Sequence, residues 1–406
     1  MGDMDRIFAG YQLRRAAASA GGGKLFRTRG AVNSRRLAVV LLAAVLAGGC
    51  LRLPRALLDA PAGDYMGRSS DPRHAMFVNE RVPDQVSVGY VENFGRALPI
   101  MPLIQSDLLI TVVSGGSIMT ATASTGKRYW SRRFNGSIVG HPLRLDNRVI
   151  FVTHHRSGSM VALDLSRGRR RWHLEFDGRP ATEPAYAEGT VYAPLDNGQL
   201  IAVNAEHGTE QWKARIGFLV TQPPLVLGNE LAVAARDTLY VLDRATGTVA
   251  HRRVLAGAPT APLAAAGDTL IVATQEGVIV AYAERGAREI WRHDVEAPVL
   301  AAPVVADDGI WVLNRRAEVW RLSARTAERV AALGGAATES LTLTADGLLV
   351  GMLDGSMTFL RRDGRVVWQE KVPGSVRAPA AVHGGAVYIA TLNGRIVQLT
   401  SRETTQ

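Results

Sequence analysis

The chain has almost no cysteine and no long apolar run. Cys50 is the only cysteine in 406 residues, so the protein has no internal disulfide and no cysteine cluster for zinc. The uncharged apolar stretch 37–46 is too short for a membrane-spanning helix, which needs roughly 20 residues. No segment shows a sustained helical period. These absences argue against a disulfide scaffold, a helical membrane protein and a helix bundle.

The sequence instead contains a repeat of about forty residues. In each repeat a small or turn residue begins a strand, and the successive spacings lie between 38 and 42 residues. The eight positions are Gly116, Gly158, Gly198, Asp237, Gly277, Ala317, Gly355 and Gly394. Short apolar strands separated by turn residues fill each repeat. The period predicts an all-β, eight-bladed β-propeller of four-stranded blades.

A tryptophan follows the next turn in most repeats. The positions are Trp130, Trp172, Trp212, Trp291 and Trp368, with His251 and Ala331 in two others. Because each sheet can bury its faces only against its neighbours, we expect these rings to dock one blade on the next.

The ends of the repeat region predict how the ring closes. The last repeat stops near Leu399 after three strands, whereas residues 86–94 precede the first repeat without a partner. Tyr90 lies 40 residues before Trp130, the spacing of one repeat. We therefore expect this N-terminal strand to complete the last blade, with Tyr90 as its docking aromatic.

The first 49 residues have the composition of a leader. Arg35 and Arg36 precede the apolar stretch, and Ala47-Gly48-Gly49-Cys50 is similar to the lipobox of bacterial lipoproteins, in which the cysteine is acylated. We expect residues 1–49 to be leader and lipoprotein signal peptide, with Val32 as an alternative start. Residues 50–82 would then be a flexible tether and residues 83–401 the propeller. The alternative is an ordinary signal peptide with an incidental cysteine.

The positive charge is concentrated in that leader. The whole chain carries +10, but residues 1–49 hold eight Lys/Arg against Asp3 and Asp5, which leaves +4 from residue 50 onwards. No recognised nucleic-acid-binding motif accompanies this modest excess. We therefore predict no nucleic-acid partner.

The repeat resembles that of pyrroloquinoline-quinone (PQQ)-type propellers. Residues 162–172 and, less fully, 241–247 are similar to their tryptophan-docking motif. That superfamily includes quinoprotein dehydrogenases and the BamB family of lipoproteins, and an eight-bladed ring behind a lipobox is similar to the latter. The resemblance implies a non-catalytic, lipid-anchored scaffold facing the periplasm. It would assist outer-membrane β-barrel assembly and hold a protein partner, such as a BamA-like component. Leu51 after the cysteine is compatible with sorting to the outer membrane.

Two other functions remain open at this stage. A quinoprotein-like, PQQ-dependent dehydrogenase would need a cysteine pair and clustered carboxylates, whereas Glu183 and Glu296 are far apart in sequence. A carbohydrate- or peptidoglycan-binding propeller would need exposed aromatics on one face. The chain also lacks the long acidic, leucine-containing inter-blade loops that the resemblance associates with BamA binding, since connections such as 217–222 are short. We predict no catalytic residue, cofactor or metal site.

We expect the propeller to be monomeric. Basic residues in its turns define two candidate surfaces for a partner. Turns between second and third strands carry His154, His155, Arg156, Arg236, Arg315 and Arg316. Turns between third and fourth strands carry Lys127, Arg128, Arg167, Arg169, Arg361 and Arg362. Either set could meet an acidic protein or lipid head groups, the alternative being ordinary solvated charge.

Overall fold

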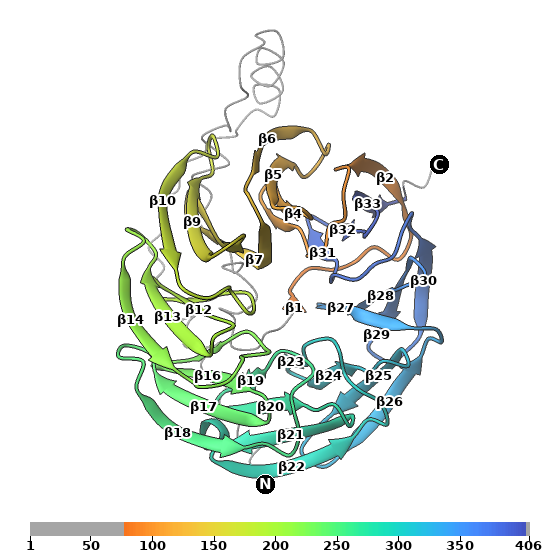
Figure 1. Cartoon of the computed structure of the whole chain (residues 1–406). Coiled ribbons are helices and arrows are strands. Elements are labelled where there is room, and N and C mark those ends of the chain that lie inside the picture. Colours follow the sequence, from red (N-terminus) through yellow and green to blue (C-terminus); the bar gives the residue numbers. More distant parts are fainter. Residues whose placement is uncertain (1–76, 403–406) are drawn as a thin grey trace, which may run out of the picture.

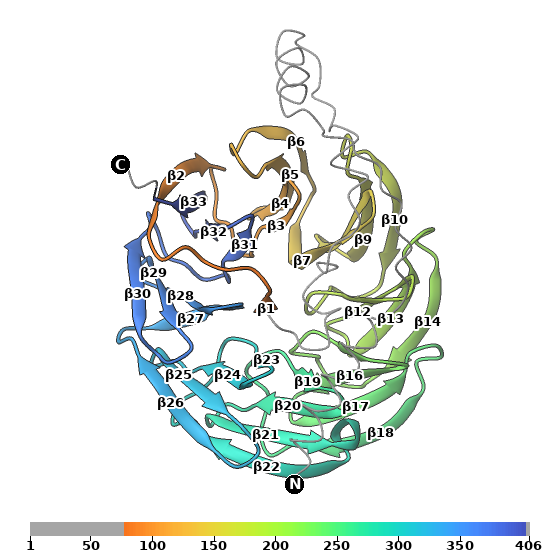
Figure 2. The same cartoon turned by 180° about the vertical axis from the view of Figure 1, so that it is seen from behind.

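The computed structural model describes residues 77–402, and these form a closed ring of eight sheets (Figure 1). Seven sheets have four strands and one has five, so the predicted all-β, eight-bladed propeller is confirmed. The ring is seen from behind in Figure 2. No helix in the described range is long and apolar enough to cross a bilayer. The expected signal peptide and Cys50 lie outside the described residues.

The first four blades occupy residues 103–254. Blade 1 contains β3 (Leu103–Gln105), β4 (Leu108–Val113), β5 (Ser117–Thr122) and β6 (Arg128–Arg133). Blade 2 contains β7 (Ser137–Leu145), β8 (Arg148–His154), β9 (Gly158–Asp164) and β10 (Arg170–Phe176). Blade 3 contains β11 (Ala185–Ala187), β12 (Thr190–Pro194), β13 (Gln199–Asn204) and β14 (Glu210–Arg215). Blade 4 contains β15 (Leu225–Leu227), β16 (Glu230–Ala235), β17 (Thr238–Asp243) and β18 (Val249–Val254).

The other four blades complete the circle. Blade 5 contains β19 (Ala264–Ala266), β20 (Thr269–Ala273), β21 (Val278–Ala283) and β22 (Arg288–Asp294). Blade 6 contains β23 (Val304–Ala306), β24 (Gly309–Leu313), β25 (Glu318–Leu322) and β26 (Ala327–Ala332). Blade 7 contains β27 (Ala337–Thr344), β28 (Gly347–Met352), β29 (Ser356–Arg361) and β30 (Val366–Lys371), with β1 (Phe77–Val78) at its inner edge. Blade 8 contains β31 (Ala381–His383), β32 (Ala386–Ala390), β33 (Arg395–Ser401) and β2 (Val86–Asn93).

Burial explains the composition of the strands. The second and third strands of a blade are covered on both faces by neighbouring blades, so β4 is apolar apart from Thr111 and is buried throughout. The outermost strands are half exposed, and β14 alternates between exposed polar and partly buried residues. The core therefore lies in the seams between blades.

The N-terminal strand closes the ring as predicted. β2 pairs antiparallel with β33 from Val86 opposite Ser401 to Asn93 opposite Arg395. The hydroxyl of Tyr90 donates a hydrogen bond to the Ala123 carbonyl of blade 1 at 2.8 Å. The strand thus completes blade 8 and joins it to blade 1.

The sheet region begins earlier than the boundary expected at residue 83. β1 pairs in parallel with the end of β27, and the Ala345 N–H donates to the Glu80 carbonyl at 3.0 Å. The Pro83 carbonyl accepts a 2.9 Å hydrogen bond from Trp368 Nε1. Residues 77–85 therefore form a strap along blade 7. A two-residue strand has no periodicity that sequence analysis could detect.

Most of the repeated tryptophans donate a hydrogen bond to the next part of the ring. Besides Trp368, the indoles of Trp130, Trp172 and Trp212 donate to the carbonyls of Leu165, Ala205 and Arg244, at 2.7, 3.1 and 3.0 Å. Trp291 differs, because its Nε1 has no partner within residues 77–402; His293 Nε2 instead lies 2.8 Å from the Ser323 carbonyl of blade 6.

Glycine at the docking turn is required by the indole that lies against it. Gly168 has a φ of 63°, and a Cβ atom there would lie 2.7 Å from Trp130 Cε3. A larger residue would have to displace the ring.

Candidate functional site

The antiparallel connectivity gives the ring two different faces. One face, which we call the connection face, carries the turns between second and third strands together with the links from each blade to the next. The other, the hairpin face, carries the turns between first and second and between third and fourth strands.

The predicted partner residues share the connection face but lie on separate blades. His154 ends β8 of blade 2, and His155 and Arg156 follow it. Arg236 follows β16 of blade 4, and Arg315 and Arg316 follow β24 of blade 6. Because blades 3 and 5 stand between them, the structure does not gather these side chains into one cluster (Figure 1).

The second basic set also divides between two regions. Arg361 pairs with Asp346 at 2.6 Å and also contacts Asp84, and Arg362 pairs with Asp308 at 3.0 Å. These two arginines therefore hold the strap and blades 6 and 7 together. The remaining four, Lys127, Arg128, Arg167 and Arg169, lie on blades 1 and 2.

An exposed apolar pair stands next to one of the predicted arginines. Phe218 and Leu219, on the link from blade 3 to blade 4, are 51% and 48% exposed. The Arg236 guanidinium carbon lies 5.7 Å from the centre of the Phe218 ring, a cation–π contact. Val254, at the end of β18, is 70% exposed and pairs with Thr238 beside the same turn. We call these four side chains, Phe218, Leu219, Arg236 and Val254, the apolar patch.

The apolar pair departs from the repeat. Five links form an isolated bridge to the turn between the second and third strands, at Pro180, Val220, Pro259, Val299 and Val376. The two residues before the bridge are Gly-Arg, Phe-Leu, Gly-Ala, Ala-Pro and Gly-Ser, respectively. Aligning the links by this position would have revealed the pair. The length of this link alone does not distinguish it from the other links.

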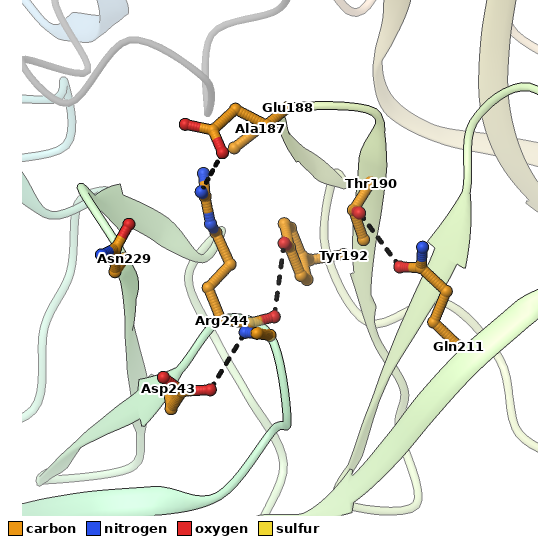
Figure 3. Close-up of a pocket in the computed structure, with 9 residues that line it drawn as sticks. Ala187, Glu188, Thr190, Tyr192, Gln211, Asn229, Asp243 and Arg244 are labelled. Carbon is orange, nitrogen blue, oxygen red and sulfur yellow. Dashed lines mark hydrogen bonds and ion pairs between the residues drawn. The ribbon is translucent and has the colours of Figure 1, made fainter.

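The hairpin face contains a polar pocket between blades 3 and 4, with a volume of about 600 Å³ (Figure 3). Its lining residues are Ala187, Glu188, Thr190, Tyr192, Gln211, Asn229, Asp243, Arg244 and Ala245. Arg244 of blade 4 pairs with Glu188 of blade 3 at 2.6 Å, and Thr190 Oγ1 donates to Gln211 Oε1 at 3.0 Å. No sequence motif marks the blade 3 side of this pocket.

The charges in this pocket are already matched. Hydrogen bonds from the hydroxyl and backbone N–H of Thr246 lower the pKa of Asp243, so this carboxyl group is ionised at neutral pH. Burial raises the pKa of Tyr192, so its hydroxyl stays protonated. The Asp243 carboxylate is held within its own turn, whereas the ion pair of Arg244 with Glu188 joins blades 3 and 4.

Each of the two carboxylates named above, Glu183 and Glu296, contacts a basic residue. Glu183 Oε2 lies 2.5 Å from His141 Nδ1 and accepts a 3.1 Å hydrogen bond from the backbone N–H of His141. Glu296 lies 3.8 Å from Arg316 and 3.9 Å from Arg329. Between residues 77 and 402 no group of three or more His, Cys, Asp or Glu is placed to hold a metal ion. These residues do not fit a quinone site with calcium, which needs six to eight oxygen ligands.

The fold and its docking motif define the class of protein: an eight-bladed propeller of PQQ-like repeats. A family model described as outer membrane protein assembly factor BamB matches residues 79–182, 156–266 and 258–406. The chain therefore belongs to this family, in agreement with the resemblance seen in its sequence.

Two curated relatives carry the same description. One, from Burkholderia pseudomallei (strain K96243), is 27% identical over 103 residues, which cover 25% of this chain and 27% of the relative. The other, from Yersinia pestis, is 23% identical over 255 residues, which cover 54% of this chain and 63% of the relative. The chain thus spans less than two thirds of the length of either relative.

Proteins of different function have solved structures with this fold. BamB from Moraxella catarrhalis aligns with a TM-score of 0.63 and 16% identity, over 78% of this chain and 99% of that one. A europium-containing methanol dehydrogenase aligns with a TM-score of 0.66 and 8% identity, over 86% of this chain and 100% of that one. At such identities the similarity shows the propeller fold alone.

Proposed function

We propose that the protein is a non-catalytic scaffold that assists the assembly of outer-membrane β-barrel proteins. It is anchored through an acylated Cys50, faces the periplasm and holds another protein of the assembly machinery. Membership of the BamB family supports this role. The observation that carries the proposed docking site is the exposed pair Phe218 and Leu219 on the connection face.

The apolar patch has the properties of a protein-binding hot spot. Aromatic, apolar and arginine side chains at the centre of an interface contribute most of its binding energy. The link that carries the pair is held in place, because Val220 bridges Ala235 and the Gly217 N–H donates to the Gly198 carbonyl at 3.1 Å. A rigid site loses less entropy on binding. The fitting partner is an apolar segment with a carboxylate that can reach Arg236.

We expect the double substitution Phe218→Ala with Leu219→Ser to weaken binding of the periplasmic domain of a BamA-like partner. Loss of both side chains removes the apolar centre of the patch, so the expected rise in Kd is about tenfold or more. Isothermal titration calorimetry with purified proteins measures it.

A matched control uses another exposed apolar residue on the same face. Leu353, in the turn after β28 of blade 7, is 48% exposed. Leu353→Ser should leave the Kd unchanged. If the two variants bind equally well, the patch is not the docking site.

The anchor is tested separately. We expect Cys50→Ser to be unacylated and to move from the membrane fraction to the soluble fraction, because its thiol is the group that would carry the lipid. Metabolic labelling with a fatty-acid analogue, followed by fractionation in about 0.5 M salt to suppress electrostatic adhesion, measures both effects. Label incorporated into the serine variant would show that Cys50 is not the acylated residue.

A further inference from the structure

The outer rim of blades 1 and 2 is strongly basic. Residues 124–133 contain four Lys/Arg and no carboxylate, and residues 166–175 contain four Arg and one carboxylate, Glu175. All eight cationic side chains are exposed. We call these eight the basic rim: Lys127, Arg128, Arg132, Arg133, Arg167, Arg169, Arg170 and Arg171.

The two segments form one continuous surface. Arg132 on β6 donates hydrogen bonds to the carbonyls of Gly168 and Arg167, at 3.0 and 3.3 Å, in the turn before β10. Trp130 reaches Leu165 in the same turn. β6 and β10 lie on adjacent blades at the circumference in both views of the ring (Figures 1 and 2). Cations 35 to 40 positions apart in the sequence are therefore neighbours in space.

Few carboxylates neutralise this rim. Arg128 pairs with Glu92 at 3.1 Å, and both side chains are exposed. Asp164 accepts hydrogen bonds from its own turn, from Ser166 and from the backbone N–H groups of Arg167 and Arg169. Across the described residues no ion pair involves Lys127, Arg133, Arg167, Arg169, Arg170 or Arg171. Most of the rim charge is therefore available to a partner.

The corresponding parts of blades 3 and 5 have mixed charge. Residues 206–215 of blade 3 hold two Glu and two Lys/Arg, and residues 284–293 of blade 5 hold two Glu and three Arg. On blade 5, Arg292 pairs with Glu289 at 2.7 Å and Arg288 with Glu284 at 3.5 Å. A run of four cations with at most one carboxylate, as in blades 1 and 2, is therefore not found in these parts of blades 3 and 5.

The composition of the rim favours an extended anionic surface over a folded protein or a nucleic acid. The exposed large apolar side chains of the described chain all lie outside residues 124–133 and 166–175, so the rim has no apolar anchor for a protein interface. Trp130 packs into the seam and presents no ring on which bases could stack. We propose that the basic rim binds the phosphate head groups of anionic phospholipids at a membrane surface. Such binding requires several cations near one plane and no shape complementarity.

The length of the N-terminal segment is compatible with this contact. Phe77 follows Cys50 by 27 residues, and a segment of that length can reach at most about 90 Å. If Cys50 carries the lipid, as proposed above, the edge of the ring can reach the same membrane. The contact would then fix which edge faces the lipid and leave the connection face free for a protein.

The test uses unacylated protein from the Cys50→Ser variant, so that any membrane binding comes from the protein surface. We expect it to float with vesicles containing about one third phosphatidylglycerol and to stay in solution with pure phosphatidylcholine. Binding should disappear when the salt is raised from about 0.05 M to about 0.5 M. Replacing Lys127, Arg133, Arg169 and Arg170 by glutamine should lower the partition coefficient about tenfold or more.

The matched control removes the same charge elsewhere on the ring. Arg215, Arg252, Arg325 and Arg365 are exposed and lie on blades 3, 4, 6 and 7. Replacing these four by glutamine should leave vesicle binding close to that of the parent. Equal losses in both quadruple variants would overturn the proposal, because binding would then depend on net charge alone. Equal binding to phosphatidylcholine vesicles would overturn it too. So would equally tight binding to duplex DNA at the same phosphate concentration.

The outcome is separable from that of the proposed scaffold function. The rim variants keep Phe218 and Leu219, so they should bind the BamA-like domain normally in solution. Loss of vesicle binding with retained partner binding supports two independent surfaces.

Discussion

A chain that begins at residue 95 is expected to form no stable ring, whereas a chain that begins at residue 77 should unfold in one cooperative transition, like the longer protein. The shorter chain lacks β2, so β33 becomes an exposed edge with unpaired backbone groups and apolar side chains. It also loses the hydrogen bond from Tyr90 to blade 1 and the one from Trp368 to Pro83. We expect the cost to be comparable to the whole free energy of unfolding, ~5–15 kcal/mol.

Thermal unfolding and size-exclusion chromatography of the two truncations measure this difference. The longer of the two chains begins at Phe77 because β1 and Glu80 contact blade 7. A soluble, monomeric chain from residue 95 with an unchanged Tm would show that the N-terminal strand is dispensable for closure.

The architecture could be predicted because it follows from a period. Spacings of 38 to 42 residues define one blade each, and the last repeat lacks one strand. A closed propeller leaves only short, protected strand edges, so the segment 86–94 was expected to pair with the last strand of the last blade. β2 occupies that place.

The candidate sites could not be read from the period, because they are departures from it. Phe218 and Leu219 occupy two positions at which the other bridged links have Gly or Ala followed by Arg, Ala, Pro or Ser, and only the bridge at Val220 sets the alignment. The contact of His141 with Glu183 joins residues 42 positions apart on different blades. A pattern found in every blade cannot reveal a contact made once.

The two proposed binding surfaces lie on different parts of the ring. The apolar patch lies on the link between blades 3 and 4, whereas the basic rim lies at the edge of blades 1 and 2. The seams between blades are held by tryptophan hydrogen bonds and by pairs such as Arg244 with Glu188. A rigid ring with separate surfaces can hold a protein partner and contact a membrane without a conformational change.

One buried residue of blade 2 breaks the rule of the repeat. At the end of β7, three consecutive residues pair with β8, and Arg144 is the middle one, opposite Val149. Only 3% of Arg144 is exposed. The equivalent residues of the other seven blades are Ile104, Tyr186, Val226, Ala265, Val305, Leu343 and Val382. All of these are apolar or aromatic. Arg144 therefore places a guanidinium where the fold otherwise buries hydrocarbon.

This guanidinium has little to compensate for its burial. None of its three nitrogens has a hydrogen-bond partner within residues 77–402. Burial lowers the pKa of Arg144, and the nearby Asp146 offsets only part of this effect. A buried charge without hydrogen bonds destabilises the folded state, so an apolar residue of similar length should be more favourable.

We therefore expect Arg144→Met to raise the free energy of unfolding by about 1–3 kcal/mol. The matched control is Arg148→Met in the same blade, since Arg148 pairs with Glu206 at 2.5 Å. Arg148→Met removes the same charge but also removes the ion pair with Glu206, so the free energy of unfolding should fall or stay unchanged. Denaturant titrations of the three proteins at one ionic strength provide the comparison. If both substitutions stabilised the ring equally, the gain would come from reduced net charge, and the burial argument would fail. If Arg144→Met destabilised the ring, the burial argument would also fail.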